Sequence, residues 1–342
     1  MTSTSPTGTS VTATDTTAPG PPGAAATGTT VLRNAATAAT ADVVLEHVSD
    51  RPLDLALTLA PLRHGAGDPT FRRSPDGALW RTTLVRTGPV TQRFVPTGDR
   101  SVVVQHWGPG AREAADAVPR LLGEDDDASA FTPPPQARDA ARRTPGLRMC
   151  RSGRVLEALV PAVLEQKVQV VTAHRAWRWL VTRHGSPAPG PAPDGMRVVP
   201  SAREWAAVPT WDWHRAGVDP RRAATAVRCA QVAARLEDAS GLPGDEARAR
   251  LEKVPGVGRW TSAEVAQRAF GDADAVSVGD FHLAGAVGWA LTGERTDDEG
   301  MLRLLAPYAP HRHRVVRLLF LERRPQAPRR GPRLSIADYR AF

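Results

Sequence analysis

Cysteine is scarce in this chain: Cys150 and Cys229 are the only two among 342 residues. Two isolated thiols cannot build a disulfide framework, a cysteine-based zinc motif or a four-cysteine iron–sulfur cluster site. We therefore expect both to be buried, small apolar side chains in a protein of a reducing compartment.

Long apolar runs and targeting signals are also lacking. No stretch of the sequence is long and apolar enough to cross a bilayer. The start of the chain has neither the basic segment nor the apolar core of a signal peptide. We expect a cytoplasmic protein with no membrane partner.

Charged and large apolar side chains are nearly absent from residues 1–41, which are mostly Thr, Ala, Ser, Gly and Pro. Such a segment cannot bury enough surface to offset the entropy of ordering. We predict that residues 1–41 form a disordered tail.

An antiparallel sheet is predicted for the segment that follows. Leucines at every second position from Leu53 to Leu59 indicate a half-buried strand. Residues 79–85, 90–95 and 101–107 also have strand character, and Thr-Gly-Pro and Thr-Gly-Asp turns separate them. A helix ending near Leu122 completes an α+β N-terminal domain, an antiparallel sheet plus helix, over residues 42–122.

Helices dominate the remainder of the chain. An acidic run and three consecutive prolines predict a linker over 123–149, before an all-α domain over 150–322 and a basic C-terminal tail over 323–342. Apolar residues at steps of three and four indicate a helix over 156–171, which Pro161 can kink. Further helices are expected at 223–236, 247–254, 259–270 and 314–321.

The charge balance favours a polyanionic partner. The formal net charge is +8 and the sequence pI is about 10.6. Much of the excess is arginine, which recognises phosphate through paired hydrogen bonds. GC-rich coding also raises arginine content, so the charge supports nucleic-acid binding without establishing it.

The most informative motif is a glycine-rich turn between two helical stretches, with the sequence Leu251-Glu252-Lys253-Val254-Pro255-Gly256-Val257-Gly258-Arg259-Trp260-Thr261. Its two glycines allow positive φ and bring bare amide N–H groups close to a ligand. Amides that converge at a helix N-terminus bind anions such as phosphate. A carboxylate follows in the segment Gly279-Asp280-Phe281-His282. The turn alone also fits an ordinary connection between two helices.

Turn and carboxylate together resemble the helix-hairpin-helix superfamily of DNA glycosylases. The resemblance implies that Asp280 is catalytic and that the amides of Gly256, Val257 and Gly258 hold a DNA phosphate. The hairpin residues that it assigns to phosphate binding are Val254, Gly256, Val257, Gly258, Arg259 and Thr261. It further implies that hairpin carbonyls can hold a monovalent cation, and that no other metal, iron–sulfur cluster or cofactor is required.

Position 260 indicates the subfamily. Bifunctional members carry a lysine there, which forms a Schiff base with the sugar and permits strand cleavage. This chain has Trp260 instead and is similar to the monofunctional DNA-3-methyladenine glycosylase II (AlkA) type over roughly residues 42–322. The resemblance implies a base-excision-repair enzyme, monomeric and nucleoid-associated. It would hydrolyse the N-glycosidic bond of flipped-out alkylated purines in double-stranded DNA.

Other positions match the subfamily less closely. The base pocket is expected to contain Trp260, Glu264 and His311, but the subfamily has a tyrosine at position 264 and a tryptophan at position 311. Glu264 is either a second acid of the pocket or a solvated helix carboxylate, the latter being favoured. Gln166 and Lys167 are candidates for the wedge that fills the gap left in the duplex, or are exposed polar residues of a helix.

Two other functions remain compatible with these residues. The chain could be a glycosylase for an oxidised or deaminated base, since two pocket positions differ from the alkylation-repair pattern. It could also be a non-catalytic protein that binds damaged DNA through the same hairpin and does not need the carboxylate of Asp280.

Overall fold

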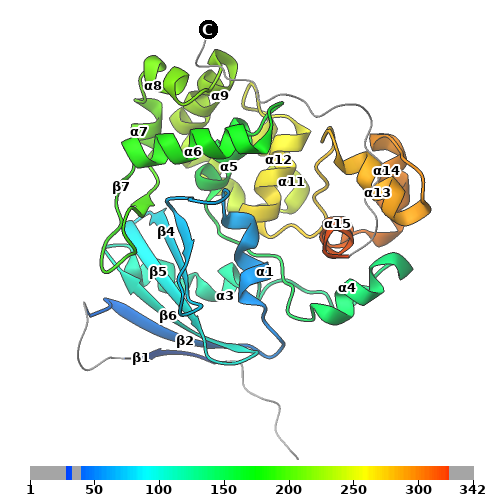
Figure 1. The fold of residues 1–342 in the computed structure, drawn as a ribbon, viewed down its shortest axis with the longest axis horizontal. Helices are drawn as coiled ribbons and strands as arrows, with labels where there is room; N and C mark the ends of the chain where they lie inside the picture. Colours follow the sequence, from blue (N-terminus) through cyan, green and yellow to red (C-terminus); the bar gives the residue numbers. More distant parts are fainter. Residues whose placement is uncertain (1–27, 33–39, 323–342) are drawn as a thin grey trace, which may run out of the picture.

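A computed structural model of the chain describes residues 28–32 and 40–322. Its N-terminal part is an antiparallel six-stranded sheet in the order β1-β2-β6-β5-β4-β3, at the lower left of Figure 1. The strands are β1 (Gly28–Leu32), β2 (Val43–Val48), β3 (Phe71–Arg73), β4 (Leu79–Val85), β5 (Gly88–Pro96) and β6 (Ser101–Trp107).

Helices make up most of the rest and lie above and to the right of the sheet in Figure 1. They are α1 (Leu55–Leu59), α2 (Ala111–Asp116), α3 (Val118–Leu121), α4 (Arg138–Arg143), α5 (Val155–Leu164), α6 (Val170–His184), α7 (Ala202–Ala206), α8 (Thr210–Arg215), α9 (Pro220–Gln231), α10 (Ala233–Glu237), α11 (Gly244–Glu252), α12 (Arg259–Val265), α13 (Leu283–Thr292), α14 (Asp298–Leu305) and α15 (Arg312–Leu321). Short 3₁₀ turns are η1 (Ala60–Leu62), η2 (Pro135–Ala137), η3 (Asp238–Gly241) and η5 (Ala306–Tyr308), and η4 (Ala266–Phe270) is a π-helical turn. The two-residue strands β7 (Ser186–Pro187) and β8 (Arg197–Val198) pair with each other.

The sheet forms because buried and less buried residues alternate along its strands. In β6, Val102 and Val104 are fully buried, whereas the residues on either side of them are partly exposed. These valines pack in one cluster with Leu55 and Leu59 of α1 and with Val118 of α3. The sheet therefore buries one face against the two short helices.

Helix α5 lies at the centre of the helical part because nearly all of its residues are apolar. Every side chain from Val155 to Leu164 is buried except that of Glu157. Glu157 accepts hydrogen bonds from Arg81 and Thr83 of β4, each at 2.5 Å. The one acid of this helix thus ties it to the sheet.

Most of the predicted elements are confirmed. Strands β4 and β6 have the predicted bounds, and β5 exceeds its prediction by only a few residues. The helices predicted before and after the glycine-rich turn are α11 and α12, the latter continued by η4 to Phe270. Cys150 and Cys229 are both buried, as expected, and burial raises the pKa of the Cys229 thiol to about 12.

Three local predictions are wrong. Residues 55–59 form helix α1, because Asp54 caps its start by accepting the N–H of Leu57 at 2.9 Å. Residues 156–171 are two helices, α5 and α6, separated by a turn. Residues 28–32 of the predicted disordered tail form β1, which pairs with β2. The rest of that tail up to residue 39, and the basic tail 323–342, lie outside the described residues.

The segment predicted as a linker, 123–149, is packed against the rest of the fold. It contains α4, and Asp126 within it is buried. One carboxylate oxygen of Asp126 accepts a hydrogen bond from Arg314 of α15, and the other accepts the N–H of Met149 at 2.9 Å. A buried ion pair therefore joins this segment to the last described helix.

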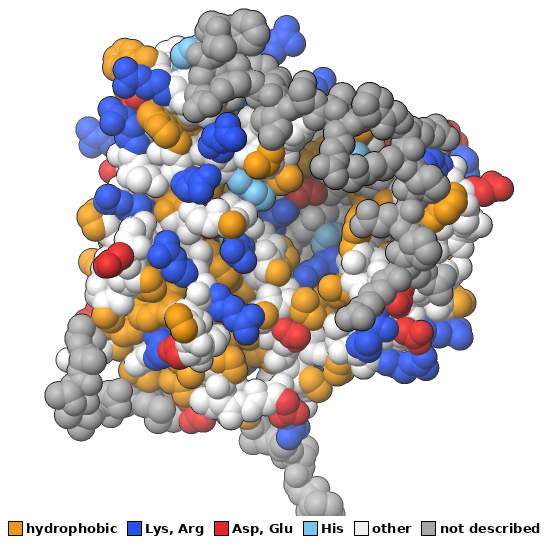
Figure 2. All heavy atoms as spheres, in the orientation of Figure 1, with side chains coloured by type: hydrophobic (Ala, Val, Ile, Leu, Met, Phe, Trp, Pro, Cys, Tyr) orange, Lys and Arg blue, Asp and Glu red, His pale blue; other side chains and the backbone are white. Residues whose placement is uncertain are grey.

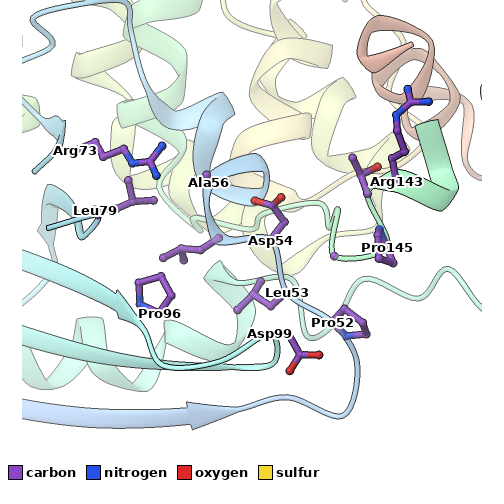
Figure 3. A pocket seen from close by; sticks show the side chains of 14 residues that line it. Pro52, Leu53, Asp54, Ala56, Arg73, Leu79, Pro96, Asp99, Arg143 and Pro145 are labelled. Atoms are coloured by element: carbon purple, nitrogen blue, oxygen red, sulfur yellow. The ribbon is translucent and has the colours of Figure 1, made fainter. Parts of the chain in front are cut away.

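The pocket drawn in Figure 3 lies on the sheet side of the molecule, between the segment Pro52–Ala56 and the loop at Pro145. Asp54, Arg73 and Asp99 line it, and none of the residues predicted for the functional site does. Within the described part of the chain, no helix combines the length and apolar character that crossing a bilayer requires.

We predict that Arg314→Met destabilises the fold strongly. The substitution leaves the buried carboxylate of Asp126 without its partner, which costs about 3–5 kcal/mol for pairs of this kind. Urea unfolding followed by circular dichroism measures the loss. The matched control is Arg303→Met on α14, because Arg303 and its partner Glu299 are largely exposed. Equal midpoints for the two variants would contradict the prediction.

Candidate active site

The glycine-rich turn is a tight hairpin between α11 and α12. The N–H of Val254 donates to the carbonyl of Leu251 at 3.1 Å, and the N–H of Val257 donates to the carbonyl of Val254 at 2.9 Å. The side chains of Val254, Val257 and Thr261 are buried. These three residues were predicted to bind phosphate, and because their side chains are buried, only their backbone groups are available for that role.

The two glycines of the turn serve different purposes. Gly256 has φ +98°, and a Cβ there would lie 2.3 Å from Oγ1 of Thr225 on α9. Gly258 has an ordinary extended φ of −109°, and a Cβ there would meet nothing within 4 Å. Of the two glycines, only Gly256 uses the positive φ that glycine allows, and Gly258 instead leaves open space where the backbone enters α12.

This open space is the place where an anion can approach. The Val257 amide is used inside the turn, but the first N–H groups of any helix lack intrahelical acceptors. Gly258 and Arg259 are exposed at the start of α12. The hairpin thus presents backbone N–H groups and a cationic side chain, which together suit a phosphate.

Gln166 braces the hairpin from the turn between α5 and α6. Its side-chain amide donates to the carbonyl of Gly256 and to Oγ1 of Thr261, both at 2.9 Å. From the other side, Nε of Arg228 donates to the carbonyl of Pro255 at 3.1 Å. Gln166 is therefore placed as a support of the hairpin.

Lys167 has a different environment from its neighbour. It is exposed, and it is the one non-glycine residue with positive φ (54°) among those that the structure describes. A positive φ is uncommon for a residue with a side chain, so the turn between α5 and α6 holds Lys167 in an unusual backbone conformation at the surface. Of the two predicted wedge residues, Lys167 is the one whose side chain is not engaged with the hairpin.

Asp280 lies where the chain enters α13, opposite the start of α12. Its Oδ2 accepts the indole N–H of Trp260 at 3.1 Å. Its Oδ1 accepts the backbone N–H groups of His282 and Leu283 at 2.8 and 2.9 Å. Three N–H donors thus hold one half-buried carboxylate. The structure brings together Trp260, predicted for the base pocket, and Asp280, predicted for catalysis.

The side chain of His282 does not serve this carboxylate in the structure. Its ring is exposed and packs edge-on against Phe281, with centroids 4.8 Å apart. Phe281 is itself 84% exposed. His282 therefore holds Asp280 through its backbone N–H, and its ring does not take part.

Glu264 lies one helical turn after Trp260 on α12. Its carboxylate accepts hydrogen bonds from Ser277 and from Arg268, the latter at 2.7 Å, and its side chain is only 14% exposed. The favoured prediction of a solvated carboxylate is wrong, because Glu264 is an ion-paired acid inside the fold. Residues four apart share a helix face, so it extends the same wall as Trp260.

His311 precedes α15 and contacts a different part of the molecule. Its ring packs edge-on against Phe131 at 5.2 Å, and Arg314 lies within 3.4 Å of its Nδ1. Burial, together with the charge of Arg314, lowers the pKa of His311. The contacts that the structure gives this side chain are therefore to α15 and the segment before α4, and none brings it together with Trp260 or Asp280.

Figure 2 shows a hollow right of centre on this face of the molecule, and Figure 1 places it between α12 and the helices α13–α15. Lys and Arg side chains are spread over the surface to its left. The contact between Trp260 and Asp280 joins the two sides, because the tryptophan belongs to α12 and the acid precedes α13.

A group of polar residues beside the hairpin was not predicted. His64, Glu165 and His174 converge next to Gln166, although they lie far apart in the sequence. Burial lowers the pKa of His64. Burial would raise the pKa of Glu165, but its hydrogen bond with His174 and the charge of Arg268 outweigh this and lower it. No local motif signals such a group.

Comparisons with known proteins agree with this architecture. No protein-family model matches the chain. It is 29% identical over 215 residues to the probable bifunctional transcriptional activator/DNA repair enzyme AlkA of Mycobacterium tuberculosis. The match covers 61% of this chain and 43% of that protein, so the chain spans less than half the length of this relative.

Two solved structures show the fold. The 3-methyladenine DNA-glycosylase from Archaeoglobus fulgidus has a TM-score of 0.67 at 18% identity, covering 81% of this chain and 98% of the other. The apo form of the Clostridium acetobutylicum 8-oxoguanine glycosylase/lyase has a TM-score of 0.64 at 12% identity, covering 82% and 96%. They confirm the predicted fold class, an α+β domain with an antiparallel sheet followed by an all-α helix-hairpin-helix domain.

We predict that alanine lowers the thermal stability of the protein at Gly256 but not at Gly258. Gly256→Ala forces a strained φ and a clash with Thr225, so the midpoint of thermal unfolding should fall by several degrees, equivalent to about 1–3 kcal/mol. Gly258→Ala meets open space at an allowed φ and should leave the midpoint nearly unchanged. Similar midpoints for the two variants would show that the hairpin does not have this geometry.

Proposed function

We propose that this chain, which has the fold of the helix-hairpin-helix DNA glycosylases and resembles AlkA in sequence, is a monofunctional DNA glycosylase of base-excision repair. The observation that carries the proposal is the position of Asp280, held beside the hairpin by the indole of Trp260. A half-buried acid, an aromatic ring and an anion-binding turn in one place suit the removal of a base from a DNA backbone.

DNA binding begins at the hairpin in this proposal. The N–H groups at the start of α12 and the guanidinium of Arg259 bind a phosphate, which sets the position of the strand without reading its sequence. The hairpin carbonyls retain lone pairs that suit a monovalent cation, since carbonyl oxygens are ligands of hard cations. Arginines elsewhere on the surface add a salt-dependent contribution to affinity.

The damaged nucleotide is then turned out of the duplex into the hollow. Extrusion costs a few kcal/mol, and less where damage weakens pairing, so part of the selectivity arises at this step. Lys167, which is exposed in the turn between α5 and α6, occupies the vacated position in the stack. Gln166 keeps this turn in place by its two hydrogen bonds to the hairpin.

The reaction is a substitution at C1′ of the deoxyribose. The bond between C1′ and the base nitrogen breaks, and the base leaves with the electron pair while positive charge develops on the sugar. The carboxylate of Asp280 stabilises that charge and accepts a proton from the water that attacks C1′. The products are a free base and an abasic site.

An alkylated purine is the substrate that this site fits best. A purine alkylated at N3 or N7 carries positive charge and leaves without a strong general acid. Trp260 stacks on it, a cation–π contact worth ~0.5–2 kcal/mol. Since position 260 lacks the lysine of the bifunctional members, no Schiff base forms and the strand is not cut.

A different lesion is the second candidate. Glu264 is ion-paired with Arg268 and hydrogen-bonded to Ser277 within one turn of Trp260. These paired polar groups can recognise the hydrogen-bonding edge of a neutral oxidised or deaminated base.

The two candidates are distinguished by incubating the protein with DNA that carries defined lesions and identifying the released bases by chromatography. Release of no base from any of these DNAs would favour a non-catalytic protein that binds damaged DNA.

We predict that Asp280→Asn lowers the single-turnover rate of base release by about 10²–10⁴-fold. The amide keeps the shape, and its oxygen can still accept the N–H groups of His282 and Leu283, whereas its NH2 group cannot accept the indole N–H of Trp260. The amide neither stabilises the sugar cation nor takes a proton. DNA affinity, measured by fluorescence anisotropy, should remain close to that of the parent. The matched control is Asp116→Asn at the exposed end of α2 in the sheet domain, which should release base at nearly the parent rate. A normal rate for Asp280→Asn would remove its catalytic role.

We also predict that borohydride traps no covalent complex between the protein and alkylated DNA. Trapping requires an imine between an enzyme amine and C1′, and Trp260 provides no amine. An 8-oxoguanine glycosylase/lyase on its own substrate serves as the positive control. A strong band of enzyme bound to DNA would refute the monofunctional mechanism.

A further inference from the structure

The three unpredicted residues beside the hairpin come from three separate segments. His64 follows η1 at the edge of the sheet domain, Glu165 ends α5, and His174 lies in the second turn of α6. One ligand atom from each lies within 4.8 Å of the other two. Nε2 of His174 and Oε1 of Glu165 are 3.5 Å apart.

We propose that His64, Glu165 and His174 bind a divalent transition-metal ion, with Zn²⁺ as the expected occupant. Two imidazoles and one carboxylate are a ligand set that suits zinc rather than magnesium or calcium, which prefer oxygen alone. With bonds of about 2.0–2.2 Å, ligand atoms of a tetrahedral zinc ion lie about 3.4 Å apart. Glu165 and His174 already have this separation, and His64, whose ligand atom lies within 4.8 Å of theirs, needs to close by at most about 1.4 Å.

The surroundings hold these side chains in position for a metal. Asp68, which is buried, accepts the backbone N–H of His64 at 2.7 Å and the indole N–H of Trp177 at 3.0 Å. These bonds fix the loop of His64 against α6, and the His64 ring packs edge-on against Trp177 at 4.9 Å. Such supporting contacts orient metal-binding histidines in known sites.

The approach of the loop also determines which nitrogen of His174 can bind. A Cβ at Gly65 would lie 2.5 Å from Nδ1 of His174, so only glycine allows the loop to pass there. Nε2 faces the carboxylate of Glu165. His174 therefore presents Nε2 to the proposed metal.

One nearby cation opposes a metal at this position. The positive charge of Arg268 lowers the pKa of Glu165 and that of His64, and it would also repel a bound cation. Its guanidinium is bound by Glu264 at 2.7 Å and by the carbonyl of Pro61 at 2.9 Å. Glu264 therefore offsets the charge of Arg268, and the carboxylate of Glu165 remains directed at the histidines.

The metal would join two parts of the fold that meet beside Lys167. His64 belongs to the loop between η1 and β3 within the sheet domain, whereas Glu165 and His174 lie on either side of the turn that carries Lys167. A bound ion would hold this turn against the sheet domain. The proposal concerns binding and stability and does not depend on glycosylase activity.

The test uses the full chain without a histidine tag, stripped of metal by a chelator. Isothermal titration with ZnCl₂ should give one site per chain, and bound Zn²⁺ should raise the midpoint of thermal unfolding, because it binds the folded state. Titration with CoCl₂ should give the visible absorption bands of a nitrogen- and oxygen-bound ion. His64→Ala and His174→Ala should abolish all three signals, whereas His214→Ala, exposed on α8, should keep them.

Absence of saturable zinc binding by the parent protein would overturn the proposal, as would equal stoichiometry in the parent and in the variant lacking both histidines. Should the alanine variants fail to fold, Glu165→Gln keeps the shape of the side chain and removes its charge. This variant should weaken zinc binding at least about tenfold, the usual cost of losing a metal-site partner. Unchanged affinity in Glu165→Gln would also overturn it.

Discussion

The hydrogen bond between Trp260 and Asp280 is the interaction on which the candidate site depends. It joins the start of α12 to the start of α13, and so connects the hairpin to the helices across the hollow. The backbone N–H groups of His282 and Leu283 bind the other oxygen, which leaves the carboxylate little freedom to rotate. A carboxylate fixed in this way can stabilise a developing positive charge without reorganising during the reaction.

The remaining contacts of the site support this pair. Gly256 lets the hairpin pass against Thr225, and Gln166 holds the hairpin from the side of α5. Because the next residue, Lys167, stands in the same turn, the hairpin and the proposed wedge are linked through one short segment. Glu264 and Arg268 form the polar wall behind Trp260, and the charge of Arg268 reaches Glu165 and the neighbouring histidines.

Sequence patterns predicted the parts of this structure that depend on local spacing. The strands of the hairpin β4–β5 and the helices around Gly256 follow from alternation, turn residues and glycine, all visible within about ten residues. The alternating leucines from 53 to 59 predicted a strand, but residues 55–59 form a short helix. The same spacing fits a single helical turn capped by Asp54 as well as it fits a strand. The burial of Glu264 and the meeting of His64, Glu165 and His174 depend on packing between distant segments, which no local pattern reports. The link between Trp260 and Asp280 was anticipated only through resemblance to a family.

The central claim is that the indole N–H of Trp260 positions the acid. Substitution Trp260→Phe keeps an aromatic face and removes that donor. A hydrogen bond to a charged group is worth about 1.5–3 kcal/mol, so single-turnover base release from alkylated DNA should slow by about 10–100-fold, with DNA affinity preserved. Trp211→Phe, at an exposed position on α8, serves as the control. An unchanged rate in Trp260→Phe would contradict the claim, because the carboxylate would then be held without the tryptophan.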